Sequence, residues 1–164
     1  MMREPERTVS QSVLDRLTNL TPKGQGDAPM SFSESVRRYK AGVLRDLEWL
    51  LNTRRIPEPI PEGLDEIEKS VYVYGLPDTT SLSGDDPAVR KQLQREIADC
   101  IRRFEPRLDD VEVKLLAPTE DTKRMVRFSV EAILRMDPDP ERIVFDTVLD
   151  PSSGKIRVAG STHA

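Results

Sequence analysis

The sequence contains a single cysteine and a single histidine among its 164 residues. Cys100 has no second cysteine to pair with, and a chain without disulfides fits a reducing compartment. His163 lies one residue from the C-terminus, where chain ends are usually mobile. Catalytic Ser-His-Asp and Cys-His arrangements therefore have no suitable base, and metal sites made of histidine and cysteine lack their ligands. We predict that Cys100 is a small core or boundary residue of a helix.

Long hydrophobic runs and a surplus of positive charge are also missing. No apolar stretch approaches the roughly 20 residues of a transmembrane helix, and the N-terminus lacks the apolar core of a signal peptide. The formal net charge of −4 argues against non-specific binding of nucleic acid, which needs an excess of Lys and Arg. Glycine-rich loops that hold phosphates are absent too. We therefore expect a cytoplasmic protein without a cofactor or metal, which neither binds nucleic acid nor inserts into a membrane.

Charged residues make up 33% of the chain and hydrophobic residues 37%. This balance suggests a compact core with long solvated faces, and the length is that of about one domain. We predict a flexible N-terminal segment over residues 1–30 and a single α+β domain over residues 31–160. Within the first segment, residues 1–8 are predicted to be disordered. Residues 10–20 carry a short amphipathic pattern that predicts a helix, followed by a glycine-rich link through Pro29.

A long helix is predicted from Ser33 to Thr53. Ser31 and Glu34 form a capping box, in which each side chain satisfies a free backbone N–H. The apolar residues of this helix recur at helical spacing, and the last three should face a sheet: Val36, Tyr39, Val43, Leu47, Leu50 and Leu51. Trp49 lies beside this stripe and is expected to be core, with an interface anchor as the alternative. Residues 56–61 are rich in proline and form a stiff connector.

A second long helix is predicted from Asp86 to Arg103. Asp86 is a suitable N-cap and Pro87 suits the first helical position. The segment that precedes this helix is ambiguous. Residues 67–77 are rich in β-branched and aromatic residues, which suggests a short strand, but a helical turn capped by Gly75 is nearly as plausible. Residues 79–85 read as a polar loop.

The last third of the chain has the alternating pattern of β-strands. Strands are predicted over residues 111–116, 125–134, 143–149 and 155–158, and turn sequences separate them. The fold class is therefore α+β, with N-terminal helices packed on one face of a small antiparallel β-sheet, a meander, in the C-terminal half.

The last hairpin of this meander, residues 143–158, should present a free edge, because no later strand can cover it. Exposed edges can accept an added strand from a partner protein. Ile156, Arg157 and Val158 are therefore candidate partner-binding residues, and the side chains of Ile156 and Val158 would help to set the register.

The change from the helical to the β pattern falls at Glu105, Pro106 and Arg107. Pro106 lacks an N–H and disfavours the α conformation at Glu105. We predict that Glu105 and Arg107 form a partly buried ionic cluster where the helix meets the sheet. Glu105 is also the best candidate for the acid of a two-carboxylate glycosidase. An arginine partner would keep its carboxylate charged, however, which favours the structural interpretation.

Arg54 and Arg55 directly follow the first long helix. Two interpretations of this doublet carry about equal weight. The arginines can belong to a solvated face and interact favourably with the end of the helix. They can also bind the acidic surface of a partner, because arginine is enriched in protein interfaces. We include both residues among the candidate partner-binding residues.

Five segments, taken together, resemble the TssE family of type VI secretion baseplate subunits. This family is related to the small wedge protein of contractile phage tails and was once labelled lysozyme-like. The segments occur in the family's order: SVLDRL at 12–17, RDLEWLLNTRR at 45–55, YGLPD at 74–78, FEPRL at 104–108 and FDTVLD at 145–150. The family's Glu-Pro-Arg element falls on residues 105–107, and its Leu-Leu-Asn-Thr-Arg-Arg element falls on residues 50–55.

The resemblance implies a non-enzymatic, structural role in a cytoplasmic baseplate. As partners it implies the wedge subunits TssF and TssG, through them TssK, and the sheath proteins TssB and TssC. It further implies that the protein initiates sheath polymerisation, with the first sheath layer adding strands to the small sheet. Two alternatives stay open: a carboxylate-dependent peptidoglycan hydrolase, as the old label suggests, and a regulatory binding module on the same fold.

Overall fold

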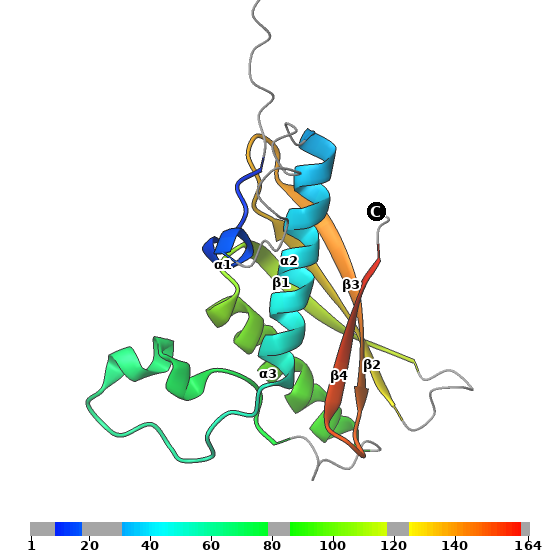
Figure 1. Ribbon diagram of the computed structural model, residues 1–164. Coiled ribbons are helices and arrows are strands. Elements are labelled where there is room, and N and C mark those ends of the chain that lie inside the picture. The colour runs from blue at the N-terminus through cyan, green and yellow to red at the C-terminus, as the bar shows by residue number, and fades with distance from the viewer. Residues whose placement is uncertain (1–8, 18–30, 79–85, 118–124, 162–164) are drawn as a thin grey trace, which may run out of the picture. The chain divides into compact units, whose positions relative to one another are not determined.

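The computed structural model describes residues 9–17, 31–78, 86–117 and 125–161 (Figure 1). The predictions for residues 1–8, the glycine-rich link, the loop at 79–85 and His163 lie outside the described residues. The chain divides into two compact units, Met1–Arg45 and Asp46–Ala164. None of the helices in the described ranges is both long and apolar enough to cross a membrane.

The first unit contains the short helix α1, Val13–Leu17, and the beginning of α2, Phe32–Asn52. α1 begins at Val13, later than predicted, and its apolar residues Val13 and Leu17 are exposed. At the start of α2, the Ser31 hydroxyl accepts the Glu34 N–H at 3.2 Å. The Glu34 carboxylate binds two arginines of the next turn, so one half of the predicted capping box forms.

The second unit contains a four-stranded antiparallel sheet of strand order β1-β2-β3-β4. The strands are β1, Leu108–Leu116; β2, Val126–Leu134; β3, Glu141–Asp150; and β4, Lys155–Ser161. The predicted α+β meander is thus confirmed. β1 begins earlier than predicted because its register shifts between Asp109 and Glu112, which lets the strand continue back to the end of the preceding helix. β4 continues to Ser161 because β3 is long enough to pair with it there.

Helix α3, Pro87–Phe104, and the last turns of α2 lie on one face of the sheet (Figure 1). The side chain of Asp86 accepts the Ala88 N–H at 2.8 Å, so the predicted N-cap is confirmed. The helices and the inward-facing strand positions together supply the core of this unit: Leu47, Leu50, Leu51, Leu93, Ile97, Ile101, Phe128, Val130, Leu134, Phe145, Leu149 and Ile156. Burying one such side chain contributes about 1.5–3 kcal/mol.

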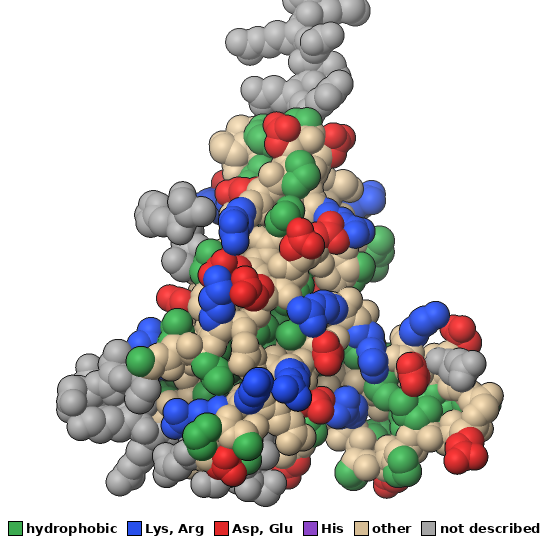
Figure 2. Space-filling model, turned by 180° about the vertical axis from the view of Figure 1, so that it is seen from behind, with side chains coloured by type: hydrophobic (Ala, Val, Ile, Leu, Met, Phe, Trp, Pro, Cys, Tyr) green, Lys and Arg blue, Asp and Glu red, His purple; other side chains and the backbone are tan. Residues whose placement is uncertain are grey.

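The prediction that Trp49 is core is wrong, because 53% of its surface is exposed. Successive helical residues are about 100° apart, so Trp49 is turned away from the side of α2 that carries Leu47, Leu50 and Leu51. The outer face of the sheet carries acidic and basic side chains beside the half-buried Ile133, Val144 and Val148, and Figure 2 shows charged and hydrophobic side chains interspersed. There Glu131 binds Lys114 at 2.6 Å and Arg142 at 3.1 Å.

The ambiguous segment before α3 forms 3₁₀ turns and no strand of the sheet. The turns are η1, Asp65–Lys69, and η2, Val71–Val73. After them, Leu76 forms a parallel bridge with Arg54, with hydrogen bonds from Arg55 N–H to Leu76 O and from Leu76 N–H to Thr53 O. Gly75 has a φ of +97°, and a Cβ there would lie 2.2 Å from Thr53 O. Only glycine allows the chain to pass this close.

Candidate functional site

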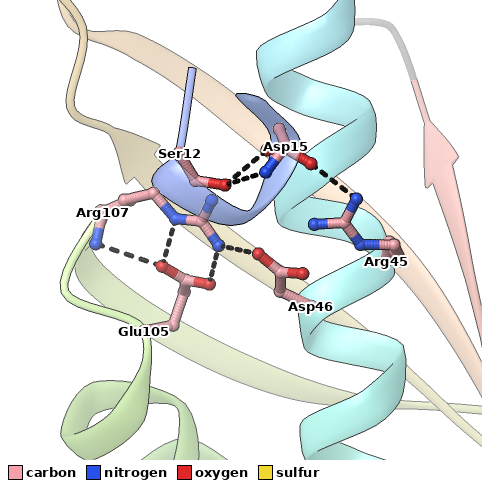
Figure 3. A network of polar contacts seen from close by, with 6 residues as sticks. All are labelled: Ser12, Asp15, Arg45, Asp46, Glu105 and Arg107. Carbon is pink, nitrogen blue, oxygen red and sulfur yellow. Dashed lines mark hydrogen bonds and ion pairs between the residues drawn. The ribbon is translucent and has the colours of Figure 1, made fainter. Parts of the chain in front are cut away.

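Glu105 and Arg107 form the ionic cluster that the sequence predicts, and Asp46 of α2 joins it (Figure 3). Arg107 donates from Nε to Glu105 Oε1 at 2.6 Å and from Nη2 to Glu105 Oε2 at 2.5 Å. The same Nη2 donates to Asp46 Oδ2 at 2.7 Å. The guanidinium thus holds Glu105 with two bonds and reaches a second carboxylate that lies 61 positions away in the sequence.

The local backbone explains why these residue types occur in this order. Glu105 is the C-cap of α3, and its N–H still donates to Ile101 O at 2.8 Å. Pro106 follows as an exposed turn residue, where a missing N–H costs nothing. Leu108 N–H then donates to Glu105 O at 3.1 Å, which closes the turn and begins β1. The turn places the Arg107 side chain back against Glu105.

The cluster is largely withdrawn from solvent. The side chain of Glu105 is 5% exposed, that of Arg107 19% and that of Asp46 24%. Burial alone would lower the pKa of the Arg107 guanidinium, but the hydrogen bonds to Glu105 and Asp46 outweigh it and the pKa is raised. The charged form of Arg107 is therefore favoured. Asp46 was not among the predicted site residues, although it stands beside Arg45 in the family-like segment.

Two further residues, Tyr74 and Cys100, have pKa values that burial raises. Burial raises the pKa of Tyr74, with further electrostatic contributions from Cys100, Asp46 and Glu105. The Tyr74 ring packs edge-on against Phe104 with 5.2 Å between centroids. Burial also raises the pKa of the Cys100 thiol to about 11. Cys100 is buried in α3, as predicted, and its thiol donates to Gly75 O at 3.5 Å.

A second polar cluster lies in the first unit (Figure 3). Ser12 donates from its hydroxyl to Asp15 Oδ2 at 2.6 Å and accepts the Asp15 N–H at 3.1 Å. Arg45 donates to Asp15 Oδ1 at 2.5 Å. Gly42 makes room for this carboxylate, because a Cβ there would lie 2.8 Å from Asp15 Oδ2. In the sequence, the signal for this contact is Gly42, a single glycine within the long predicted helix.

The β4 edge of the sheet is partly occupied by a side chain. Asn52, the last residue of α2, accepts the Ile156 N–H at 2.9 Å and donates to Ile156 O at 2.8 Å. In an antiparallel ladder the backbone groups of alternate residues point toward the same neighbour. Since the groups of Ile156 point away from β3, those of Val158 and Gly160 also point outward. Arg157, between them, pairs with Val148 of β3.

At the opposite edge, side chains of α3 bind two backbone carbonyls of β1. Arg102 donates to Val111 O at 2.7 Å, and the side-chain amide of Gln94 donates to Val113 O. These carbonyls lie on alternate residues, so both belong to the outward side of β1. An added strand would have to displace both side chains. On β4, Asn52 occupies the outward groups of Ile156, and the outward groups of Val158 and Gly160 are the candidates for pairing with an added strand.

The predicted site residues do not all gather in one place. Arg54 and Arg55 line a hollow of about 680 Å³ beside the proline-rich connector, together with Arg103 and the carboxylates of Glu58 and Asp78. Arg54 is exposed and lies 3.9 Å from Asp78, whereas Arg55 lies 3.3 Å from Glu96 of α3.

The last hairpin presents its three candidate residues differently. Ile156 is 1% exposed, so its side chain belongs to the core and is closed to a partner. Arg157 is exposed and Val158 is half-buried.

Residues 37–139 match the family model described as baseplate wedge protein gp25. The chain belongs to this family. The matched residues make up more than half of the gp25-family chain and include most of α2, the whole of α3 and the strands β1 and β2. A comparison with curated proteins finds no match.

Membership in the gp25 family establishes the general class of function. The protein is a structural, non-enzymatic baseplate component of a contractile, phage-tail-like assembly. The site agrees with this, because both oxygens of the buried Glu105 carboxylate accept hydrogen bonds from Arg107, as in a structural ion pair. Within the described ranges of this gp25-family chain, no group of three His, Cys, Asp or Glu residues could hold a metal ion.

Proposed function

We propose that this protein is the TssE-type subunit of a type VI secretion baseplate, working in the cytoplasm. In this role it binds the wedge subunits TssF and TssG, and through them TssK, and starts polymerisation of the TssB–TssC sheath by β-strand addition. Family membership supports the baseplate role. The five family-like segments of the sequence, among them the Glu105-Pro106-Arg107 element, support the assignment to type VI secretion.

The observation that carries the proposal is the difference between the two sheet edges. Side chains of α3 bind the outward carbonyls of β1. On β4, the outward groups of Val158 and Gly160 lie beyond the one position that Asn52 occupies. Main-chain hydrogen bonds from an extended sheath segment can therefore continue the sheet at β4. The basic side chain of Arg157 keeps this edge soluble before the sheath arrives.

Wedge binding is assigned to two surfaces of the second unit. The buried cluster around Arg107 makes the α3–β1 junction rigid and presents the exposed Pro106 at a fixed position. Arg54, Arg55 and Arg103 supply positive charge to a hollow that is also lined by apolar residues and by Glu58 and Asp78. An acidic segment of a wedge subunit fits this second surface.

Charge reversal of Arg54 and Arg55 to Glu should leave the isolated fold intact and weaken co-purification with TssF and TssG by at least about tenfold, the size of a typical interface anchor. The matched control reverses Lys91 and Arg95, which are exposed on α3 and give the same change of net charge. Equal loss in both double variants, or no loss in either, would remove Arg54 and Arg55 from the interface.

The strand-addition proposal is tested by removing one outward N–H from β4. Val158→Pro removes the N–H of an edge residue, a position at which proline is tolerated. Val158→Thr keeps the N–H and the β-branched shape and serves as the control. Fluorescently labelled sheaths should disappear in cells carrying the proline variant and persist with the threonine variant. Normal sheaths with a folded Val158→Pro protein would show that β4 is not the template.

A further inference from the structure

The side-chain amide of Asn52 imitates a neighbouring strand at one position of the β4 edge. It exchanges two hydrogen bonds with the backbone of Ile156, as a paired strand residue would. Its Nδ2 also donates to Glu48 O at 2.7 Å. Because Nδ2 faces two carbonyl oxygens, a flipped amide would place oxygen against oxygen, so these contacts fix the amide orientation.

Both ends of this contact are held in place. Ile156 is anchored by a side chain that is 1% exposed. Asn52 is the last residue of α2, and the following residue, Thr53, is held by its hydroxyl bond to Trp49 O at 2.7 Å and by its carbonyl bond from Leu76 N–H. The amide is therefore a fixed feature of the edge.

We propose that Asn52 is a built-in stop for strand addition on β4. An extended partner segment pairs with the outward groups of Gly160 and Val158, and Asn52 prevents it from pairing with Ile156. This inference rests on the proposed function, because it defines how much of the same edge the sheath can use. The partner it specifies is a short extended segment that ends its main-chain pairing at Val158. Asn52 thus acts as a specificity-determining residue for the length of the added strand.

The free protein provides the first test. In full-length wild-type protein, the Ile156 N–H should exchange with deuterium more slowly than those of Val158 and Gly160. Asn52→Ala should accelerate exchange at Ile156 by about tenfold, the effect of one net hydrogen bond. Asn52→Asp, which has the same shape but places a carboxylate oxygen against Ile156 O and Glu48 O, should also accelerate exchange at Ile156. Equal exchange at Ile156 and Val158 in the wild-type protein would overturn the proposal.

The second test measures exchange in the complex with the sheath subunits. These subunits are taken from the genome that encodes this protein, and they serve as the probe. In the wild-type complex, exchange should slow at Val158 and Gly160 while the side-chain NH₂ resonances of Asn52 stay unchanged. With Asn52→Ala, protection on binding should extend to Ile156. A merely structural contact between α2 and β4 would not produce this extension.

Two results with the bound complex would refute the proposal that Asn52 stops strand addition. Binding that displaces the Asn52 amide in the wild-type protein would show that the amide does not limit pairing. Binding to Asn52→Ala that leaves Ile156 unprotected would show that something else ends the added strand. If the sheath protects neither Val158 nor Gly160 in any variant, the proposed function fails at this edge, and the Asn52–Ile156 contact of the free protein is unaffected.

Discussion

Removing the Arg107 side chain should destabilise the protein more than any other single change in its ionic cluster. Arg107→Ala leaves the Glu105 carboxylate, whose side chain is 5% exposed, without the guanidinium that binds both of its oxygens. Breaking a buried ion pair from one side costs about 3–5 kcal/mol. Since the Arg107 side chain is 19% exposed, we expect a loss near the lower end, about 3 kcal/mol. Asp46→Ala should cost less, because Arg107 then keeps Glu105.

The assay is urea denaturation of the full-length protein, followed by circular dichroism. A double-mutant cycle separates the charge from the packing of the arginine stem. Glu105→Gln in the Arg107→Ala background should recover a large part of the loss, because a neutral amide costs less to bury than an unpaired carboxylate. If Arg107→Ala costs less than about 1 kcal/mol, or if the two changes are simply additive, the cluster does not stabilise the junction as described.

Two further stability predictions concern single positions. Gly75→Ala should cost more than about 2 kcal/mol, because it combines a left-handed residue with a Cβ only 2.2 Å from Thr53 O. Gly63→Ala is its control: φ there is +78° but nothing lies within 4 Å, so roughly 1–2 kcal/mol is expected. Equal losses in urea denaturation would refute the close approach at Gly75. Thr147→Val should stabilise the protein by about 1 kcal/mol, because its hydroxyl is buried without a hydrogen-bond partner among the described residues; a lower melting temperature would contradict this.

Helices and strands were predicted well where their formation depends on residues that are close together in the sequence. Asp86 before Pro87 marks the start of α3, and the alternation in residues 125–134 marks β2, because both depend on residues close in sequence. The Glu105–Arg107 pair was predictable for the same reason. β4 was predicted too short because its last residues, Ala159 to Ser161, have little β preference of their own and are ordered by pairing with β3.

The contacts that define the candidate site were not predictable, because they join residues distant in the sequence. Asp46 reaches Arg107 across 61 positions and Asn52 reaches Ile156 across 104. The periodicity of the sequence predicts that Asn52 lies near the end of a helix. Which backbone groups its amide contacts depends on how that helix packs against the sheet. Ile156 was predicted to be accessible for the same reason, whereas its side chain faces the core.

The central claim is that the sheath joins the β4 edge of this sheet. It is tested most directly by site-specific photo-crosslinking in cells, with p-benzoylphenylalanine in place of Arg157 on β4 or Lys114 on β1. Both side chains lie on the outer face of the sheet and on opposite edge strands, so the two variants form a matched pair. The account predicts a crosslink to a sheath subunit from position 157 and none from position 114. A crosslink from position 114 alone would contradict it.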